Sequence, residues 1–140
     1  MFELHPQLAK DCLVLGDFPL SRVLLNRDAN YPWFILVPRR DAIREIFELS
    51  EADQQQLLWE SSYFSQQIYP LFNADKLNVA ALGNMVPQLH MHHIVRYEND
   101  VAWPGPVWGK VPAIAYDASQ LKAIVEKVCS ALKVSFQPAE

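Results

Sequence analysis

Three of the four histidines of the chain lie close together, at His90, His92 and His93. Side chains alternate along a β-strand, so His90 and His92 would share one face, roughly 6.5 to 7 Å apart, while His93 would lie on the other. Imidazole is largely neutral near pH 7, can attack phosphorus to form a phosphoramidate, and can protonate a leaving oxygen when it stands beside the nucleophile. The pair therefore indicates either a metal site or nucleophilic catalysis on phosphorus.

A metal site needs more ligands than this pair supplies. A His-x-His pair on a strand commonly provides two zinc ligands. However, His93 would lie on the opposite face, His5 is remote in sequence, and Cys12 and Cys129 are far apart without CxxC spacing. Zinc stays open as an alternative, as do two imidazoles on a solvated sheet face, but the residues favour phosphorus chemistry without a metal or other cofactor.

A strand that carries these histidines requires a sheet around it. Short apolar runs bounded by turn residues predict strands. Such runs lie at residues 12–17, 21–27, 33–38, 76–83 and 88–97. Helical connections are too few for a parallel sheet, so the sequence predicts an antiparallel sheet of about five strands.

Helical patterns occur on both sides of the last two predicted strands. Residues 50–72 have apolar side chains at helical spacing, and Ser50 followed by Asp53 resembles a capping box. Residues 117–132 predict an amphipathic C-terminal helix, and residues 5–12 a brief helix or turn. The Pro-rich stretch 98–116 predicts an ordered loop. Together these segments predict an α+β fold with one long helix and a C-terminal helix.

The size and charge of the chain limit its partners. Its 140 residues predict a single domain, residues 1–140. Acidic residues outnumber basic ones by 16 to 12, giving a net charge of −4, which argues against binding a nucleic acid duplex. The sequence contains no run of about 18 apolar residues, which a membrane span would need, so we expect a cytoplasmic protein.

The stretch "QLHMHHI" resembles the signature of the histidine triad (HIT) family of nucleotide hydrolases and transferases, in which three histidines alternate with apolar residues. His90 falls on the middle histidine, which is the nucleophile of the family. His92 falls on the third, near the leaving group. Gln88 stands where the first histidine is expected, and His93 occupies an ordinarily apolar position.

The resemblance extends over residues 12–97 and implies further site residues. Asn26 ends a predicted strand where the family bonds the ribose hydroxyls, and Gly83 and Asn84 match the residues beside the phosphates. The residues alone also allow Asn26 and Asn84 to be turn formers. Gln88 together with the Trp-Pro loop "WPGPVWG" is similar to a bacterial branch of the diadenosine polyphosphate hydrolase type.

Three positions depart from other branches of the family. Trp33 stands where a histidine begins the third strand, and Met85 where a Ser or Thr follows the glycine, so both changes are expected to remove polar contacts. Gln88 is expected to replace the hydrogen bonds of the first imidazole with those of an amide. In the family a main-chain carbonyl supports the nucleophile, and the resemblance therefore implies an altered rate or specificity rather than loss of activity.

The resemblance implies that His90 attacks the α-phosphorus of a nucleotide derivative, a dinucleoside polyphosphate or a nucleoside phosphoramidate, and that His92 assists the leaving group. It implies a small-molecule nucleotide as partner, no metal requirement, and a homodimer. The alternative is a catalytically weak nucleotide-binding module on the same scaffold.

Five further side chains near these segments have less specific interpretations. Trp103 and Trp108 are expected to pack the Pro-rich loop against the sheet, although either could stack on a base. Arg39, Arg40 and Arg44 are expected to form a solvated basic cluster that could attract an anionic substrate.

Overall fold

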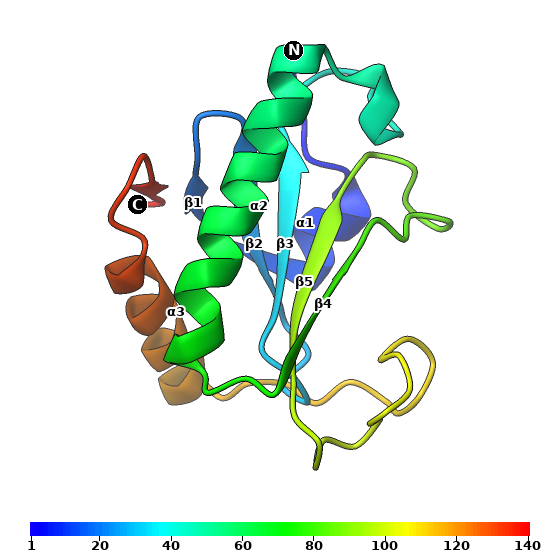
Figure 1. Ribbon diagram of the computed structural model, residues 1–140. Coiled ribbons are helices and arrows are strands. Elements are labelled where there is room, and N and C mark those ends of the chain that lie inside the picture. Colours follow the sequence, from blue (N-terminus) through cyan, green and yellow to red (C-terminus); the bar gives the residue numbers. More distant parts are fainter.

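An antiparallel sheet of six strands forms the centre of the protein, which we describe from a computed structural model of residues 1–140 (Figure 1). The strands are β1 (Cys12–Asp17), β2 (Ser21–Asn26), β3 (Trp33–Pro38), β4 (Lys76–Ala80), β5 (Met91–Arg96) and β6 (Gln137–Pro138). Their order is β4-β5-β3-β2-β1-β6, and all neighbouring pairs are antiparallel. The predicted α+β class is confirmed, and all five predicted strands are present.

The sheet differs from the prediction at its two edges. β6 is an additional strand of two residues, which pairs with β1 at Gly16 and Asp17. A Cβ atom at Gly16, where φ is +154°, would lie 2.2 Å from the carbonyl oxygen of Gln137, so only a glycine lets β6 approach. At the other edge, β4 and β5 are shorter than predicted because residues 81–90 leave the sheet as an irregular segment.

Three α-helices and a 3-10 helix surround the sheet. They are α1 (Pro6–Asp11), η1 (Ile46–Glu48), α2 (Glu51–Leu71) and α3 (Ala118–Ala131). Ser50 caps α2 by accepting a hydrogen bond from the Asp53 N–H, which is one half of the predicted capping box, while the Asp53 carboxylate binds Arg40 instead of the Ser50 N–H. Asp117 and Gln120 form a complete capping box at the start of α3. None of the helices combines the length and the hydropathy that a membrane-spanning segment requires.

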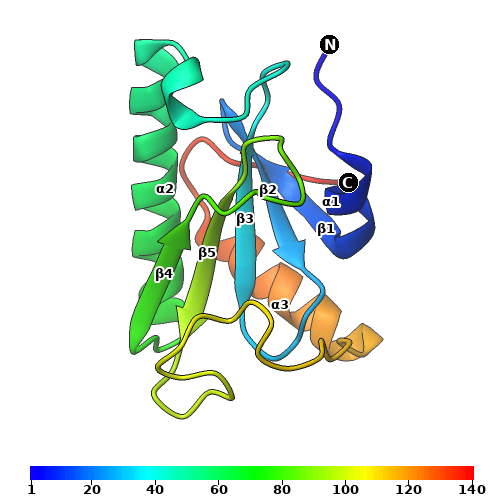
Figure 2. The ribbon, with the colours of Figure 1, turned by 90° about the vertical axis from the view of Figure 1, so that its right-hand side faces the viewer.

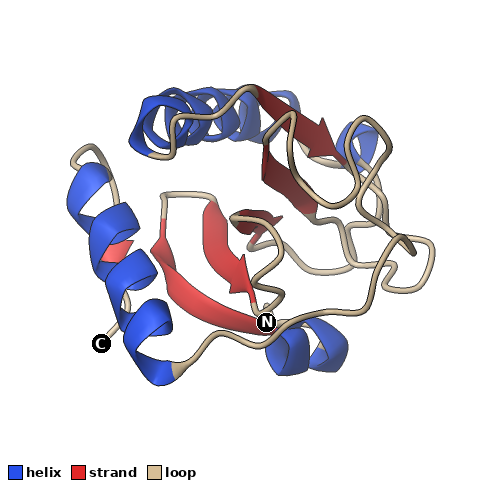
Figure 3. Cartoon of the chain, turned by 90° about the horizontal axis from the view of Figure 1, so that it is seen from below, coloured by secondary structure: helices blue, strands red, loops and turns tan.

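Each face of the sheet has its own apolar core, and helices cover both faces. α2 lies on one side of the strands and α1 on the other (Figure 2), and a view from below shows the helices around the strands (Figure 3). The core beneath α2 and α3 contains Leu15, Phe18, Val23, Leu25, Phe34, Leu36, Phe64, Ile68, Val95, Val128, Leu132 and Phe136. The core beside α1 contains Leu8, Cys12, Leu24, Tyr31, Trp33, Ile35, Val37, Val86, Ile94, Ala102 and Val107.

The Pro-rich segment after β5 is irregular, as predicted, and is held by Arg96. The guanidinium group is buried and makes two hydrogen bonds to the carboxylate of Asp100, at 2.8 and 3.0 Å. It also donates to Asn78 Oδ1 at 2.7 Å and to the Gly105 carbonyl oxygen at 2.8 Å, and it lies over the ring of Trp103. One side chain therefore ties β4, β5 and the loop together.

Candidate active site

Alternation along β5 separates the three clustered histidines, as predicted. β5 begins at Met91, so His90 precedes the regular strand, but the His90 and His92 rings still lie side by side with centroids 4.9 Å apart. His93 lies on the opposite face, where its Nε2 accepts a hydrogen bond from the Ser61 hydroxyl at 2.7 Å. Burial lowers the pKa of His93 to about 4, so this ring is a neutral core group.

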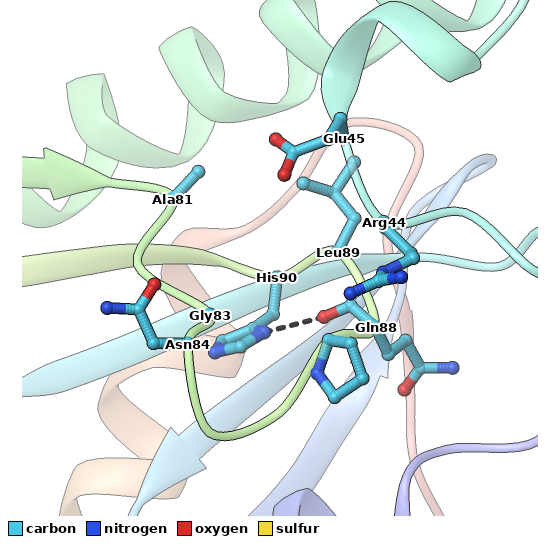
Figure 4. A pocket seen from close by; sticks show the side chains of 9 residues that line it. Arg44, Glu45, Ala81, Gly83, Asn84, Gln88, Leu89 and His90 are labelled. Carbon is cyan, nitrogen blue, oxygen red and sulfur yellow. Dashed lines mark hydrogen bonds between the residues drawn. The ribbon is translucent and has the colours of Figure 1, made fainter.

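The hydrogen bond of His90 determines which of its ring nitrogens can act. Its Nδ1 lies 2.7 Å from the main-chain carbonyl oxygen of Gln88 (Figure 4). A carbonyl only accepts hydrogen bonds, so Nδ1 carries a proton, and in the neutral ring Nε2 then keeps the lone pair. A neutral imidazole with a free Nε2 can act as a nucleophile, and its support is the main-chain carbonyl that the resemblance implied.

His92 has the opposite arrangement, because its Nδ1 is an acceptor. The indole Nε1 of Trp33 donates a hydrogen bond to His92 Nδ1 at 3.0 Å, and His92 Nε2 lies 3.2 Å from the Leu82 carbonyl oxygen. The expectation that Trp33 removes a polar contact to the triad is therefore wrong, since an indole N–H is itself a donor. Burial, followed by the proximity of His90, lowers the pKa of His92 to about 4.

Gln88 contributes to the site through its backbone, while its side chain binds the N-terminal segment. Its Oε1 accepts a hydrogen bond from the His5 N–H at 2.9 Å, and its Nε2 donates to the Glu3 carbonyl oxygen at 2.8 Å. The expectation that this amide takes over the supporting hydrogen bonds of the first imidazole is therefore wrong, because both of its hydrogen bonds go to the N-terminal segment. The amide fastens residues 3–5 beside the triad.

Two hollows share part of their walls, and both are lined by Gly83, Asn84 and His90. One is mainly apolar, with a volume of about 390 Å³, and its remaining lining residues are Leu8, Asp11, Cys12, Asn26, Trp33, Ile35, Leu82, Met85, Val86, His92 and Trp108. The other is polar, with a volume of about 90 Å³ (Figure 4), and is further lined by Arg44, Glu45, Ala81, Pro87, Gln88 and Leu89. We call them the apolar hollow and the polar hollow.

Gly83 occupies a position where a side chain would collide with the site. A Cβ atom there would lie 2.7 Å from the Val86 carbonyl oxygen and 3.2 Å from His90 Cε1. Asn84 follows it and lines both hollows, whereas the neighbouring Met85 is almost fully exposed. The backbone of residues 83 and 84 is thus free to approach a ligand beside His90.

Asn26 is a turn residue, which is one of its two interpretations, and its contact with a ribose stays a prediction. Its Oδ1 accepts a hydrogen bond from the Asp28 N–H at 2.9 Å, which makes it a turn residue at the end of β2. It also lines the apolar hollow. A turn that fixes the side chain in this way positions it for a ligand.

The two tryptophans of the Pro-rich loop have different surroundings. Trp108 packs edge-on against Trp33 and His92, with ring centroids 5.8 and 5.0 Å apart, and lines the apolar hollow. Trp103 packs on Arg96. Packing was expected for both, but nothing in the spacing of the sequence distinguished Trp108 as a residue of the site.

The three arginines expected to form one solvated cluster lie in three environments. Arg39 donates to the Phe18 and Pro19 carbonyl oxygens, and Arg40 forms an ion pair with Asp53 at 2.7 Å. Arg44 alone lines the polar hollow, and its side chain makes no ion pair. Only Arg44 is therefore placed to meet an anion beside His90.

The zinc alternative lacks ligands. Nowhere in the chain do three or more His, Cys, Asp or Glu side chains gather closely enough to hold a metal ion. Cys12 is buried in the wall of the apolar hollow, where burial raises the pKa of its thiol to about 12, and Cys129 is half-buried. The residues present do not fit a zinc centre.

The fold and this histidine arrangement define a class of protein. A model of the HIT domain matches residues 7–99, which is more than half of the chain, and the chain therefore belongs to the histidine triad (HIT) family. Proteins of this family are generally nucleotide hydrolases or transferases.

Three solved structures agree with this assignment over nearly the whole chain. A histidine triad protein of Marinobacter aquaeolei is 55% identical, with a TM-score of 0.92, and the match covers 94% of this chain and 96% of that one. Histidine triad proteins of Bradyrhizobium japonicum and Sinorhizobium meliloti are 45% and 37% identical, with TM-scores of 0.93 and 0.92, and each match covers 94% of this chain and 98% of the other. Among curated proteins, no match was found.

Proposed function

We propose that this protein hydrolyses nucleotide derivatives at their α-phosphorus, with His90 as the nucleophile. The observation that carries the proposal is the hydrogen bond from His90 Nδ1 to the Gln88 carbonyl oxygen, which assigns the lone pair of the neutral ring to Nε2. This nitrogen belongs to a residue that borders both hollows, so a phosphorus atom held there can have a substituent on either side.

The chemical character of the hollows supports an assignment of the two substituents. The apolar hollow is large enough for a nucleoside, with Trp33 and Trp108 as aromatic walls and Asn26 within it for the ribose. The polar hollow is smaller and holds Arg44, which suits the group beyond the α-phosphate. Gly83 and Asn84 would lie beside the phosphate between them.

The reaction would proceed in two displacements. The lone pair of His90 Nε2 forms a bond to the α-phosphorus while the bond from phosphorus to the leaving group breaks, and the leaving group departs with the electron pair of that bond. The Gln88 carbonyl stabilises the positive ring through Nδ1. Water then adds to phosphorus, the phosphorus–Nε2 bond breaks, and the electron pair returns to His90. The proton released by the water goes to solvent.

A hydrolysis panel tests this function against the alternative of a weakly active binding module. Dinucleoside polyphosphates, nucleoside phosphoramidates and other adenylated compounds would be incubated with the protein and with His90→Ala, and the released mononucleotide measured. We expect turnover of at least one class, and a loss of about 10³-fold or more in His90→Ala. Nucleotide binding without turnover of any class would instead support the binding module.

We also propose that the chain forms a homodimer through the outer side of β4. This strand is at the edge of the sheet, and an unpaired edge beside apolar side chains invites a partner. The exposed apolar side chains Leu58 and Val79 border a hollow here, next to Ile46 and Met91. A second copy of the chain offers the same edge and the same patch, as a two-fold interface requires.

A further inference from the structure

We propose that Trp33 is a positioning residue that fixes His92 as a neutral ring, and that the protein therefore prefers substrates whose leaving group departs without a proton, which are phosphoric anhydrides rather than phosphoramidates. This inference rests on the proposed function and assigns its substrate class.

The two hydrogen bonds of His92 determine its protonation state without reference to any titration. An indole N–H can only donate, so Nδ1, at 3.0 Å from Trp33 Nε1, must be the acceptor. A carbonyl oxygen can only accept, so Nε2, at 3.2 Å from the Leu82 oxygen, must carry the proton. His92 is thus the neutral tautomer with its proton on Nε2, the reverse of His90.

Protonating His92 would destroy this arrangement. A proton on Nδ1 would place two N–H donors, those of Trp33 and His92, against each other in a buried site. The ring is also enclosed by the edge of Trp108 and lies beside the His90 ring, which opposes a second charge. The pKa of His92, lowered to about 4 by burial first and by His90 next, is consistent with this geometry.

The hydrogen bond to the Leu82 carbonyl oxygen opposes the lowering of the His92 pKa, but no titratable side chain around the ring does. The titratable side chains nearest to it are His90 and, across the strand, His93, and both oppose a positive charge on it. Asp11 and Cys12 line the apolar hollow with it, from α1 and β1, but neither forms a hydrogen bond or ion pair with the ring. At neutral pH His92 is therefore not an imidazolium acid.

The consequence for the leaving group follows from its basicity. When the bond between phosphorus and an amine breaks, the nitrogen must gain a proton, and a neutral imidazole N–H is too weak an acid to supply it. When an anhydride bond breaks, a phosphate oxygen departs as an anion and needs only a cation nearby. Arg44 in the polar hollow is such a cation and carries no proton that it can give up at neutral pH.

The tautomer of His92 is measurable in the unmodified protein. Long-range correlation spectra between ring protons and nitrogens, recorded on protein labelled with ¹⁵N-histidine, distinguish protonated from unprotonated nitrogens. We expect His90 to be protonated at Nδ1 and His92 at Nε2 at pH 7. A His92 ring that is protonated at Nδ1, or charged at this pH, would overturn the proposal regardless of any variant.

Substitutions at Trp33 test whether the indole is the cause. Trp33→Phe keeps an aromatic ring but removes the donor, so the His92 ring should populate both tautomers and titrate at higher pH. Trp33→His restores a donor and should return His92 toward its original tautomer. Trp103→Phe is the matched control, because Trp103 packs on Arg96 outside the site and should leave the His92 spectrum unchanged.

A set of adenylates with different leaving groups tests the substrate class. The parent protein should have a kcat/KM for a dinucleoside polyphosphate about 10²- to 10⁴-fold above that for an adenosine phosphoramidate, the range of a missing general acid. Trp33→Phe should reduce this ratio as the pH is lowered, whereas a purely structural defect would lower both rates alike. Glu45→Gln is measured in parallel because Glu45 is the only carboxylic acid among the residues that line the polar hollow and could itself donate a proton to the leaving group.

The outcomes separate failure of the inference from failure of the function. Equal rates for anhydride and phosphoramidate in the parent protein, with a nucleotide on His90 in both reactions, would refute the inference and leave the hydrolase intact. No nucleotide on His90 with any substrate would refute the hydrolase itself, while the tautomer measurement would still decide whether Trp33 holds His92.

Discussion

At the scale of single residues, the site is organised by which ring nitrogen of each histidine carries the proton. His90 donates from Nδ1 to a main-chain carbonyl, and His92 accepts at Nδ1 from Trp33. The same side chain thus appears in two tautomers within 4.9 Å, between ring centroids. The nucleophile that we propose, His90, is the ring whose Nε2 makes no hydrogen bond.

The close contacts around Gly83 predict the effect of adding a single methyl group beside His90. In Gly83→Ala the new Cβ would lie 2.7 Å from the Val86 carbonyl oxygen, so the segment must shift and His90 Cε1, at 3.2 Å, must shift with it. We expect kcat/KM to fall by about 10²-fold, as for misplacement of a reacting group. Steady-state kinetics measure this effect.

Gly105→Ala is the control for Gly83→Ala. Its nearest neighbour would be the Ala102 carbonyl oxygen at 3.2 Å, with no histidine in reach. Hydrolysis that is unaffected in Gly83→Ala, or equally reduced in both variants, would contradict a specific role for the glycine beside His90.

The two buried histidine rings predict how folding stability depends on pH. The pKa values of His92 and His93 are lowered from 6.5 to about 4, so between pH 6.5 and 4 the unfolded chain binds protons that the folded chain does not. Their contribution to the free energy of unfolding is complete above pH 6.5 and is lost as the pH falls toward 4, by on the order of 3 kcal/mol for each ring. Denaturant titrations at several pH values measure it.

A double variant on the far side of β5 isolates one of these rings. His93→Phe with Ser61→Ala removes His93 and the hydroxyl bonded to it, and leaves His92 in place. The loss of stability between pH 6.5 and 4 should shrink by about half. A pH profile identical to that of the parent protein would show that His93 is not a neutral buried ring.

At this scale, the sequence was enough to predict on which face of a strand each histidine lies. It was not enough to predict hydrogen-bond partners that are distant along the chain. Two-residue alternation was enough to separate His93 from His90 and His92. The partners of Gln88 lie 83 to 85 residues away along the chain, in the N-terminal segment. Trp33 reaches His92 because β3 pairs with β5 in a register that sets Ile35 opposite His92, and composition does not reveal register.

At the scale of elements, Arg96 connects β5 to the Pro-rich loop that carries Trp108. Its guanidinium is planar and makes four hydrogen bonds, to Asp100, Asn78 and Gly105. The ammonium group of a lysine has a different geometry and cannot reproduce the paired bonds to a carboxylate. The position of this loop, and of one wall of the apolar hollow, depends on the hydrogen bonds of this guanidinium group.

Arg96→Lys should therefore destabilise the protein and loosen the loop. Because one partner of a buried ion pair is impaired, we expect a loss of about 3 kcal/mol in the free energy of unfolding. Denaturant unfolding measures the loss, and limited proteolysis locates it. Arg22→Lys is the control, since the pair of Arg22 with Asp17 is partly exposed and should contribute below about 1 kcal/mol. Similar losses in the two variants would contradict the role given to Arg96.

The elements themselves were largely predictable, and the exceptions have physical causes. Ser50 marked the start of α2, and apolar runs marked β1 to β5. β6 was missed because it has two residues, one of them Pro138, and exists only where Gly16 leaves room for it. Both ends of the irregular segment 81–90 were predicted as strand because they are apolar. The prediction was wrong because Ala81, Leu82 and Leu89 line the hollows instead of a sheet face.

At the scale of the whole molecule, one edge of the sheet is covered and the other is exposed. β6 and the C-terminal segment cover β1, while β4 carries the exposed side chain of Val79 on the other edge. Joining two copies along β4 would bury that edge and continue the sheet across both chains. The proposed dimer makes this edge an interface rather than a liability for aggregation.

A single charge on the β4 edge tests the dimer. Val79→Lys should convert a dimer into a monomer, because two lysines would meet near the two-fold axis. Sedimentation velocity over a range of concentrations measures the mass. Val134→Lys, at an equally exposed valine beyond α3, should leave it unchanged. A parent protein that sediments as a monomer would contradict the proposal directly.

The most direct test of the central claim is to trap the nucleotide on His90. The protein would be mixed with a dinucleoside polyphosphate for milliseconds, denatured at alkaline pH because the phosphorus–nitrogen bond is labile in acid, and its intact mass measured. We predict a mass increase of one nucleoside monophosphate, located by peptide mapping to His90 and absent from His90→Ala. Turnover without such an adduct, or the same adduct in His90→Ala, would contradict the account.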